Sequence, residues 1–497
     1  MSNRGNYGLS LFNEFEKLNV KFDKLIIENK NLSLTIYSLN SEIKSLTKEL
    51  EEAHEVIKKL QEDNDRLKNQ INKNSTNSSK PSSTNIITPK KKTGANLYNY
   101  RTKTDKKIGG QFGHIGHNLS KKQVEDLINT KKIEVRTITH TIKGKSIKAN
   151  TIKYKLGIEI KPYVEEHIFI YSEESKETLP IEFYSDVTYD NSIKALSLEL
   201  GAYNVISYDR LSDFFNVITD GILNISNGTL VNFLREFSVK SKASLDNLEY
   251  DILNSKNIHT DETGTKFNKK NMYVRNYSNE RSVIYKAHKS KGHKPILEDN
   301  ILPKFCGGIM GDHDTTLYSY GSKNYECNIH IGRYLEEIIQ NVPNTLWEVE
   351  MKDLIFRMYN TRNIAISYGL KRFDKEKIKE YETEYDNILK LAKEENKNIK
   401  SSFYKDKSNK LYRRLKKYKK NHLYFIKDFN VPFDNNLSEQ DIRVFKTKTK
   451  ISGGFRSMDI AKCYVDTLSI IKTAKKRDIN PYHAIEQVFN GNILFAN

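Results

Sequence analysis

The chain has 497 residues, of which 37% are hydrophobic, so it is long and apolar enough for several domains with buried cores. No apolar run approaches the roughly 18 residues of a membrane-spanning helix, and the first residues lack the apolar stretch of a secretory signal, which excludes a membrane protein and favours the cytoplasm. The net charge of +19 is carried in blocks that a polyanion could neutralise, which makes nucleic acid the leading partner. The three cysteines show no CxxC spacing and so indicate neither a disulfide framework nor a zinc cluster.

A seven-residue repeat runs through residues 10–72. Leucine recurs at heptad position d, as at Leu32, Leu39 and Leu46, while position a is mostly β-branched or aromatic except for Asn29 and Asn64. Ile at a with Leu at d favours a parallel two-stranded coiled coil, and Asn at a fixes its register. We therefore expect a dimerisation helix on the order of 90 Å long. A helix that folds back onto its own chain is the alternative.

The next three segments differ in composition. Residues 73–120 are rich in Asn, Ser, Thr, Lys and Gly, which predicts a flexible basic linker, and His114 and His117 within it lack the partners of a metal site. Residues 121–185 alternate polar and apolar positions, which is typical of a small β-rich module. Residues 186–254 change to a helical period, and their two short helices leave open either a DNA-reading helix-turn-helix or a packing unit.

A strand-rich part and a helical part follow. Residues 255–329 contain four segments with strand alternation, and residues 330–427 are helical. The last helical stretch intersperses Tyr412, Tyr418 and Tyr424 among Lys and Arg. That mixture suits a DNA-backbone groove, and it equally suits a solvated helix whose tyrosines pack inward.

One carboxylate and a basic strip mark residues 428–460. In the segment DNNLSEQDIRVFKTKTKISGGFRS, Glu439 follows two asparagines that are able to cap a helix. Asp261 and Asp312 each stand at the end of a predicted strand. Three carboxylates from separate elements could hold two Mg²⁺ ions roughly 3.5–4 Å apart, which is the arrangement that cuts phosphodiesters. Acidic residues are common, so the spacing alone is a weak signal. Residues 461–497 form apolar helices that close the core.

Several motifs occur together, in order, from about residue 74 to the C-terminus. They are NSSKPSS, GGQFGHIGH, SNGTLVNFL, HTDETG, GDHDTTLYSYG, CNIHIGRYL and the DNNLSEQDIR segment with its KTKISGGFRS end. This assembly resembles the IS66 family of bacterial insertion-sequence transposases of the DDE type. The heptad repeat agrees with the leucine-zipper start of that family.

The resemblance implies an α/β multidomain fold. Its ribonuclease H-like catalytic core would carry a helical insertion and would follow a coiled coil, a basic linker and a small β-rich plus helical module. Asp261, Asp312 and Glu439 would hold two Mg²⁺ ions, for which Mn²⁺ can substitute, and Asp314 competes with Asp312 for the second position. Many relatives carry paired CxxC zinc ligands in the small module, but residues 121–185 contain no cysteine, so zinc is not expected.

The resemblance also explains the basic strip after Glu439. Its cations would hold the phosphate backbone of a transposon end beside the metal site. They are Arg443, Lys446, Lys448, Lys450 and Arg456.

The implied protein is a homodimeric DDE transposase. It would bind the ends of its insertion sequence, cut the DNA and join it to target DNA at the bacterial nucleoid, without any membrane. The alternative is a catalytically inactive dimeric DNA-binding protein derived from a transposase, and a coiled-coil scaffold that coats nucleic acid is a further one. The sequence leaves open accessory proteins of the same element, the terminal repeat and the target preference.

Overall fold

The computed structural model describes residues 3–74, 77–78, 119–138, 152–170, 183–342 and 345–496, with side chains from residue 12 onward. The chain divides into two units, each described by itself. The first comprises Met1–Pro89 and His330–Phe429, and the second comprises Lys90–Ile329 and Asn430–Asn497. The predicted linker, including His114 and His117, falls almost entirely outside the described residues. Within the described ranges, every helix is too short or too polar to cross a bilayer.

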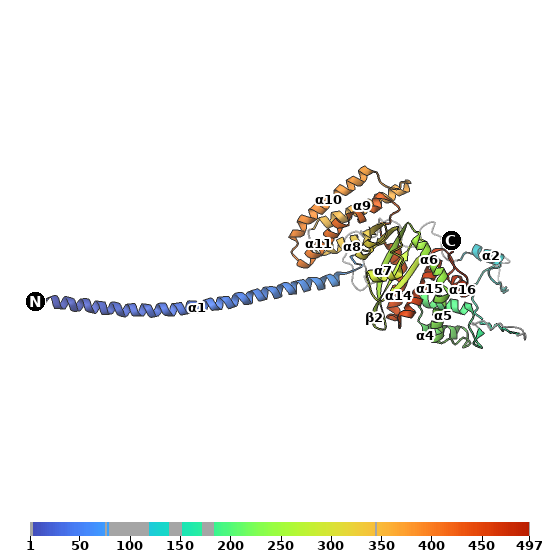
Figure 1. Ribbon diagram of the computed structural model, residues 1–497, viewed down its shortest axis with the longest axis horizontal. Coiled ribbons are helices and arrows are strands. Elements are labelled where there is room, and N and C mark those ends of the chain that lie inside the picture. The colour runs from blue at the N-terminus through green and yellow to red at the C-terminus, as the bar shows by residue number, and fades with distance from the viewer. Residues whose placement is uncertain are drawn as a thin grey trace, which may run out of the picture. The chain divides into compact units, whose positions relative to one another are not determined.

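The first unit is helical, as expected for residues 330–427 (Figure 1). Its helices are α1 (Asn3–Asn72), most of α8 (Asn328–Asn341), α9 (Trp347–Ser367), α10 (Lys375–Glu395), α11 (Ser402–Lys417), α12 (Lys419–His422) and α13 (Tyr424–Lys427), with a 3₁₀ turn at Asn396–Asn398. Trp347 is fully buried and donates its indole N–H to Asn396 at 3.0 Å. Tyr381 and Tyr385 of α10 are buried in the same unit.

One face of α1 docks on other helices of its unit. Asn69 is 3% exposed and donates to the Glu337 carboxylate at 2.8 Å, and Lys407 of α11 reaches the same carboxylate at 2.6 Å. Nearer the N-terminus, Asp65 accepts a hydrogen bond from Ser401, and Glu62 accepts one from Ser402. In the heptad count, Glu62 and Asn69 occupy position f and Asp65 occupies position b. These positions lie opposite the a/d stripe, so the docking contacts are polar and leave the stripe clear.

The a/d stripe itself is open to solvent. Its large apolar side chains from Phe15 to Ile71 are 50–69% exposed. Every described side chain from Phe12 to Gln61 is exposed, so this part of the helix does not pack on the other described helices of its unit.

The second unit contains one mixed sheet. Its strands are β1 (Asn257–Phe267), β2 (Lys270–Ser278), β3 (Val283–His288), β4 (Gly308–Gly311) and β5 (Lys323–Glu326), in the order β3-β2-β1-β4-β5. β2 is antiparallel to β1 and β3, whereas β4 runs parallel to β1 and β5 runs parallel to β4. The first four strands match the prediction, but the four-residue β5 was missed. β1 also continues to Phe267, so Asp261 lies within the strand rather than at its end.

Helices surround this sheet (Figure 1). They are α3 (Asn191–Leu198) with the π-helical turn Glu199–Tyr203, α4 (Tyr208–Ile218), α5 (Asn227–Lys240), α6 (Lys242–Leu253), α7 (His293–Asp299), α14 (Asn436–Ser452), α15 (Met458–Lys476) and α16 (Pro481–Phe489), with a 3₁₀ turn at Thr315–Ser319. α15 covers the free edge of β3: the N–H groups of Val283 and Tyr285 donate to the hydroxyls of Thr473 and Ser469, at 3.1 and 3.0 Å. Ser469 and Thr473 are four residues apart, so one helix face protects the edge strand from pairing with another chain.

The described part of residues 121–185 differs from the expected β-rich module. It contains the helix α2 (Lys121–Asn129), whose N-cap Ser120 forms a capping box with Gln123. Residues 152–170 carry no strand assignment, and side chains such as Ile158 and Val164 are 90% and 93% exposed. Alternation produces a strand only when a neighbouring strand supplies hydrogen bonds, and no described segment pairs with this one.

Two glycines turn the chain at the end of α14. Gly453 (φ 69°) is the left-handed C-cap, and Gly454 (φ 142°) follows it. The turn lets the Phe455 N–H donate to the Lys266 carbonyl at 2.9 Å, which adds a short extension beside β1. Phe455 then stacks on Phe445 of α14 with ring centroids 5.9 Å apart. The glycine pair is therefore structural.

Gly454→Ala should destabilise the second unit more than Gly453→Ala does. A Cβ at Gly454 would lie 2.3 Å from the Lys266 carbonyl oxygen, whereas a Cβ at Gly453 meets no atom within 4 Å. We expect Gly453→Ala to cost about 1–2 kcal/mol of unfolding free energy from backbone strain alone, and Gly454→Ala to cost more because the strand extension must also move. Thermal unfolding of the full chain measures both, and equal losses would contradict the clash.

Candidate active site

Asp261 and Asp312 are neighbours across two parallel strands. The β1–β4 register pairs Asn257 with Gly308 and His259 with Met310. Continued by two residues, the same register places Asp261 opposite Asp312, which directly follows β4. Neighbouring strands lie about 4.8 Å apart, and in-register residues point to the same face of a sheet. The register therefore predicts that the two side chains lie near the same face of the sheet.

A buried asparagine fixes the start of the helix that carries Glu439. Asn435 is 0% exposed, and its side-chain amide donates to the Thr260 carbonyl at 2.8 Å. Its amide oxygen lies 3.1 Å from His259 Nδ1. Burial lowers the pKa of His259 to about 4, so the ring is neutral near pH 7 and its Nδ1–H donates to Asn435. The side chain was predicted as a helix cap, but it makes no capping bond and instead ties α14 to β1.

A second set of hydrogen bonds lies one residue before Glu439. Ser438 is fully buried, and its hydroxyl donates to the Asn276 amide oxygen at 2.8 Å. The Asn276 amide in turn donates to the Ser438 carbonyl at 3.2 Å. The same Asn276 oxygen accepts the backbone N–H of Asp261 at 2.9 Å. One side chain on β2 thus connects the residue before Glu439 with Asp261 itself.

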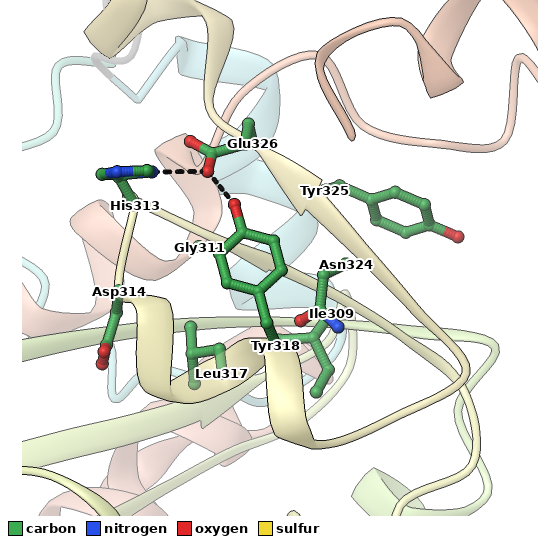
Figure 2. A pocket seen from close by; sticks show the side chains of 9 residues that line it. All are labelled: Ile309, Gly311, His313, Asp314, Leu317, Tyr318, Asn324, Tyr325 and Glu326. Carbon is green, nitrogen blue, oxygen red and sulfur yellow. Dashed lines mark hydrogen bonds and ion pairs between the residues drawn. The ribbon is translucent and has the colours of Figure 1, made fainter. Parts of the chain in front are cut away.

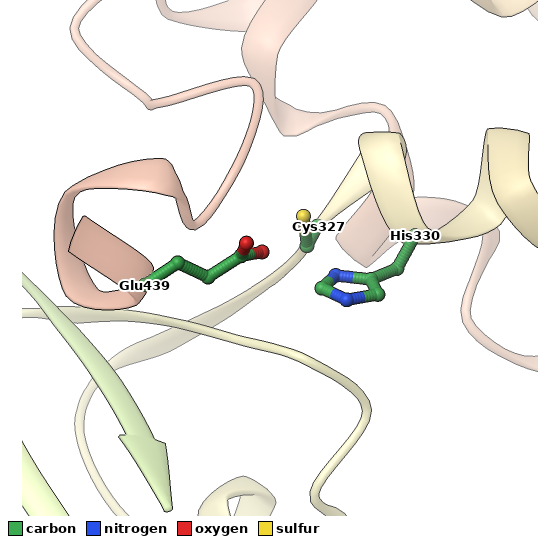
Figure 3. A group of neighbouring side chains, drawn as sticks. All are labelled: Cys327, His330 and Glu439. Atoms are coloured by element: carbon green, nitrogen blue, oxygen red, sulfur yellow. The ribbon is translucent and has the colours of Figure 1, made fainter. Parts of the chain in front are cut away.

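Cys327, which directly follows β5, connects that strand to the start of α14. The Asn435 backbone N–H donates to Cys327 Sγ at 3.3 Å, and the Cys327 N–H donates to the Gly311 carbonyl, just before Asp312, at 3.2 Å. Cys327 Sγ and a carboxylate oxygen of Glu439 lie within 4.8 Å of each other (Figure 3). His330, also drawn there, belongs to the other unit. Sequence reasoning did not assign a role to Cys327, although it lies in one of the motifs that carried the family resemblance.

Asp314 has a structural role. Its carboxylate binds Arg275 at 2.9 Å and caps the following turn by accepting the Thr316 N–H at 3.1 Å. Burial acts to raise the pKa of Asp314, but the hydrogen bonds from Thr316 and Arg275 outweigh it and hold the pKa below its usual value. Arg275 is 2% exposed and also binds Glu262 at 3.0 Å. These contacts favour Asp312 over Asp314 as the second acid.

The turn between the two aspartates is held by a buried glutamate (Figure 2). His313 has a left-handed backbone (φ 37°), and its Nδ1 lies 2.7 Å from the carboxylate of Glu326. Tyr318 donates its hydroxyl to the same carboxylate. Glu326 ends β5, is 1% exposed and stands in register with Gly311. It therefore anchors the turn that carries Asp312, a role that sequence reasoning missed because β5 is so short.

The basic strip is divided between two faces of α14. Arg443, Lys450 and Arg456 are exposed, and Lys446 lies 3.5 Å from the Asp261 carboxylate. Lys448 instead lies half-buried over the rings of two tyrosines, Tyr208 and Tyr464, at 5.8 and 5.7 Å, and burial lowers its pKa. Arg443, Lys446 and Lys450 follow Glu439 by four, seven and eleven residues and share its helix face. Lys448 does not belong to that face.

The other acid of α14 is paired inside the unit. Asp441 is 3% exposed and lies 2.6 Å from Lys476 and 3.3 Å from Lys472, both on α15. Its carbonyl oxygen accepts the Tyr285 hydroxyl at 2.8 Å. Asp441 thus joins α14 to α15 and β3, which leaves Glu439 as the carboxylate of this helix next to β1.

Asp261, Asp312 and Glu439 are all carboxylates, and carboxylates form a suitable donor set for hard divalent cations. Carboxylate oxygens are the ligands that Mg²⁺ and Mn²⁺ take. The nearby Cys327 is a softer ligand, and its sulfur accepts the Asn435 N–H. A cation already lies beside Asp261 in the form of the Lys446 ammonium. By residue type, the three carboxylates suit Mg²⁺ or Mn²⁺.

Comparison with known proteins gives two matches. Residues 187–463 match the family model described as "Transposase IS66 family". This range covers more than half of the chain and includes Asp261, Asp312 and Glu439. The chain is also 27% identical over 183 residues to the "Uncharacterized protein y4jO" of Sinorhizobium fredii, which covers 35% of this chain and 52% of that protein. The chain thus spans about half the length of this relative.

Asn435→Ala should destabilise the second unit, whereas Asn436→Ala should not. The first change leaves the buried Thr260 carbonyl and the His259 N–H without their partner, and each such group costs about 1–3 kcal/mol. Asn436 is exposed on the same turn, so its replacement should stay within about 0.5 kcal/mol. Urea unfolding of both variants measures the difference, and equal midpoints would show that Asn435 does not clamp α14.

Proposed function

The chain belongs to the Transposase IS66 family, and from this premise we propose that it is a DDE transposase that binds the ends of its insertion sequence and catalyses metal-dependent DNA cleavage and strand transfer. One observation carries the proposal. Asp261 lies on β1, Asp312 directly follows the parallel strand β4, and Asn435 and Ser438 hold the helix of Glu439 against β1 and β2. All three acids are present, so no observation favours the inactive DNA-binding alternative.

We interpret the sheet as a ribonuclease H-like core. The mixed sheet is followed after β5 by a helical segment of the first unit, and the chain then returns to the second unit with α14. This order supports a catalytic core with a helical insertion between its second and third acids. The insertion separates Glu439 from β1 in sequence but not in space, because hydrogen bonds of Asn435 and Ser438 hold the start of α14 against β1 and β2.

The chemistry is divided between the bound cations and the chain. Two Mg²⁺ or Mn²⁺ ions, when bound, would activate water and stabilise the attacking and leaving oxygens of the phosphodiester. Asp261, Asp312 and Glu439 would hold them, and the Asn276 side chain accepts the backbone N–H of Asp261 and so helps to orient that residue. The mechanism requires no nucleophilic side chain.

The exposed cations of α14 position the DNA. Arg443 and Lys450 share the helix face of Glu439, and Arg456 follows the glycine turn, so all three could contact phosphates beside the acids. Lys446 lies on the same helix face and pairs with Asp261, so it is also placed near the acids. Lys448 is assigned to packing against the tyrosines rather than to DNA.

We also propose that the active protein is a homodimer joined by α1, working on DNA in the bacterial nucleoid. The exposed a/d stripe with Asn29 and Asn64 supports this assembly. Polar contacts through Glu62, Asp65 and Asn69 use the opposite face of the helix, so docking to the first unit and pairing with a second copy do not compete.

Asp261→Asn, Asp312→Asn and Glu439→Gln should each abolish cleavage of a supercoiled plasmid that carries the ends of the element, assayed with Mg²⁺. Each change removes a ligand charge but keeps the side-chain shape, so a loss of several kcal/mol of transition-state stabilisation should slow cutting about a thousandfold or more. Dimerisation and DNA binding should persist. Cleavage at the parental rate by all three variants would refute the mechanism.

Asp314→Asn is the matched control for the second acid. It should still cut, with a lower thermal midpoint, because Arg275 loses one carboxylate partner and keeps Glu262. If Asp314→Asn is inactive while Asp312→Asn cuts normally, then the two acids have been assigned the wrong way round.

Leu39→Lys combined with Leu46→Lys should convert the dimer into a monomer, because both changes place charges in the a/d seam. Ser41→Lys combined with Ser45→Lys adds the same charge at positions f and c and should leave the dimer intact. Sedimentation equilibrium measures the mass against the 57.8 kDa of one chain. A parent protein of monomer mass at micromolar concentration would rule out the proposed assembly.

A further inference from the structure

Positive charge in the helical insertion is concentrated in its last helices. Residues 330–401 contain thirteen Lys and Arg and thirteen Asp and Glu, so their charges balance. Residues 402–427, which form α11, α12 and α13, contain ten Lys and Arg and a single acid, Asp406. The net charge of the insertion therefore arises entirely from this segment.

Some of these cations are used inside the unit. Lys407 binds Glu337 at 2.6 Å, Lys419 binds Asp386 at 2.7 Å, and Lys427 binds Glu382 at 2.6 Å. Lys410 pairs with Asp406, four residues earlier on α11. The pairs of Lys407, Lys419 and Lys427 hold α11–α13 against α8 and α10.

Four other cations point outward. Arg413, Lys416, Lys417 and Lys420 are all exposed, and no carboxylate among the described residues forms an ion pair with any of them. Arg413, Lys416 and Lys417 lie three and four residues apart on α11, which places them on one helix face, and Lys420 continues the row into α12. The row extends for roughly 10 Å at 1.5 Å per residue.

Tyrosine rings support the lysines of this row. Lys416 lies 5.9 Å from the ring centre of Tyr412, and Lys417 lies 5.0 Å from that of Tyr418. Lys420 lies 5.9 Å from Tyr424. The rings are half-buried and covered by ammonium groups, so they hold the charges at the surface and are poorly placed to stack on bases. The row therefore offers charges for phosphates and little that could read a sequence.

From this arrangement we propose that Arg413, Lys416, Lys417 and Lys420 form a second DNA surface, on the helical insertion, which binds the backbone of double-stranded DNA without sequence preference. The inference rests on the proposed function only in taking DNA as the polyanion. Charge complementarity selects the partner: a duplex carries one charge per about 1.7 Å of axis, and ammonium and guanidinium groups free of acids release its counterions on binding. The outward cations of α14 belong to the other unit.

The test compares two full-length variants that each lose four charges. One replaces Arg413, Lys416, Lys417 and Lys420 with Gln. The matched control replaces Lys375, Lys379, Lys390 and Lys393 of α10, which are equally exposed in the same unit but lie among Glu376, Glu380 and Glu394. The probe is a fluorescent duplex of random sequence, titrated over a series of KCl concentrations. Thermal unfolding and sedimentation confirm that both variants keep the parental fold and mass.

The first variant should weaken duplex binding and reduce the slope of log K against log salt by about 0.9 for each phosphate that the variant no longer neutralises, up to about 3.6. The α10 control should keep the parental slope. A third variant with Lys416, Lys417 and Lys420 changed to Arg should also keep it, since the positive charge and not the identity of the side chain binds the phosphate.

Three results would overturn the proposal. The first is an unchanged slope in the first variant, and the second is an equal reduction in the α10 control. The third comes from a parallel titration with anionic lipid vesicles: the first variant binds the vesicles more weakly than the parent but binds DNA as the parent does. The outcome is separate from that of the active site. Triad variants that still cut would refute the transposase mechanism while leaving the slope difference standing, and an unchanged slope would refute this surface while leaving metal-dependent cleavage standing.

Discussion

The geometry of the second unit depends on the three hydrogen bonds of Asn435. Its side chain binds the Thr260 carbonyl and the His259 ring, and its N–H binds Cys327, so β1, the end of β5 and the start of α14 meet at one buried amide. A buried amide without these partners would incur a desolvation cost, which makes any sliding of α14 unfavourable. Glu439 therefore stays beside β1 although the helical insertion separates them in sequence.

Periodicity was sufficient to predict much of the fold. Alternation located β1 to β4, the heptad repeat located α1, and the change of period located the helical insertion. It failed where a segment was too short to show a period, as in β5, or where alternation met no partner strand among the described residues, as in residues 152–170. Pairing is a property of two segments, and one segment alone does not reveal it.

The candidate site was predictable in its residue types but not in the direction of its side chains. The motifs identified Asp261, Asp312 and Glu439. The sequence does not show, however, whether an asparagine such as Asn435 caps its helix or hydrogen-bonds to a neighbouring strand. Lys448 and Lys450 are the same residue type in the same basic segment, yet Lys448 is half-buried against tyrosines and Lys450 is exposed. Only tertiary packing determines which cations remain available to a ligand.

The two faces of α1 have a consequence for how the helix can change in length. The leucine seam and the docking residues Glu62, Asp65 and Asn69 belong to one continuous helix, so the number of residues between them sets their relative angle. Adding or deleting one residue rotates everything upstream by about 100°, whereas seven residues restore the phase to within about 20°. If the seam pairs with a second copy as proposed, a change in rod length by whole heptads would preserve that pairing, whereas any other change in length would turn the seam away from the partner helix.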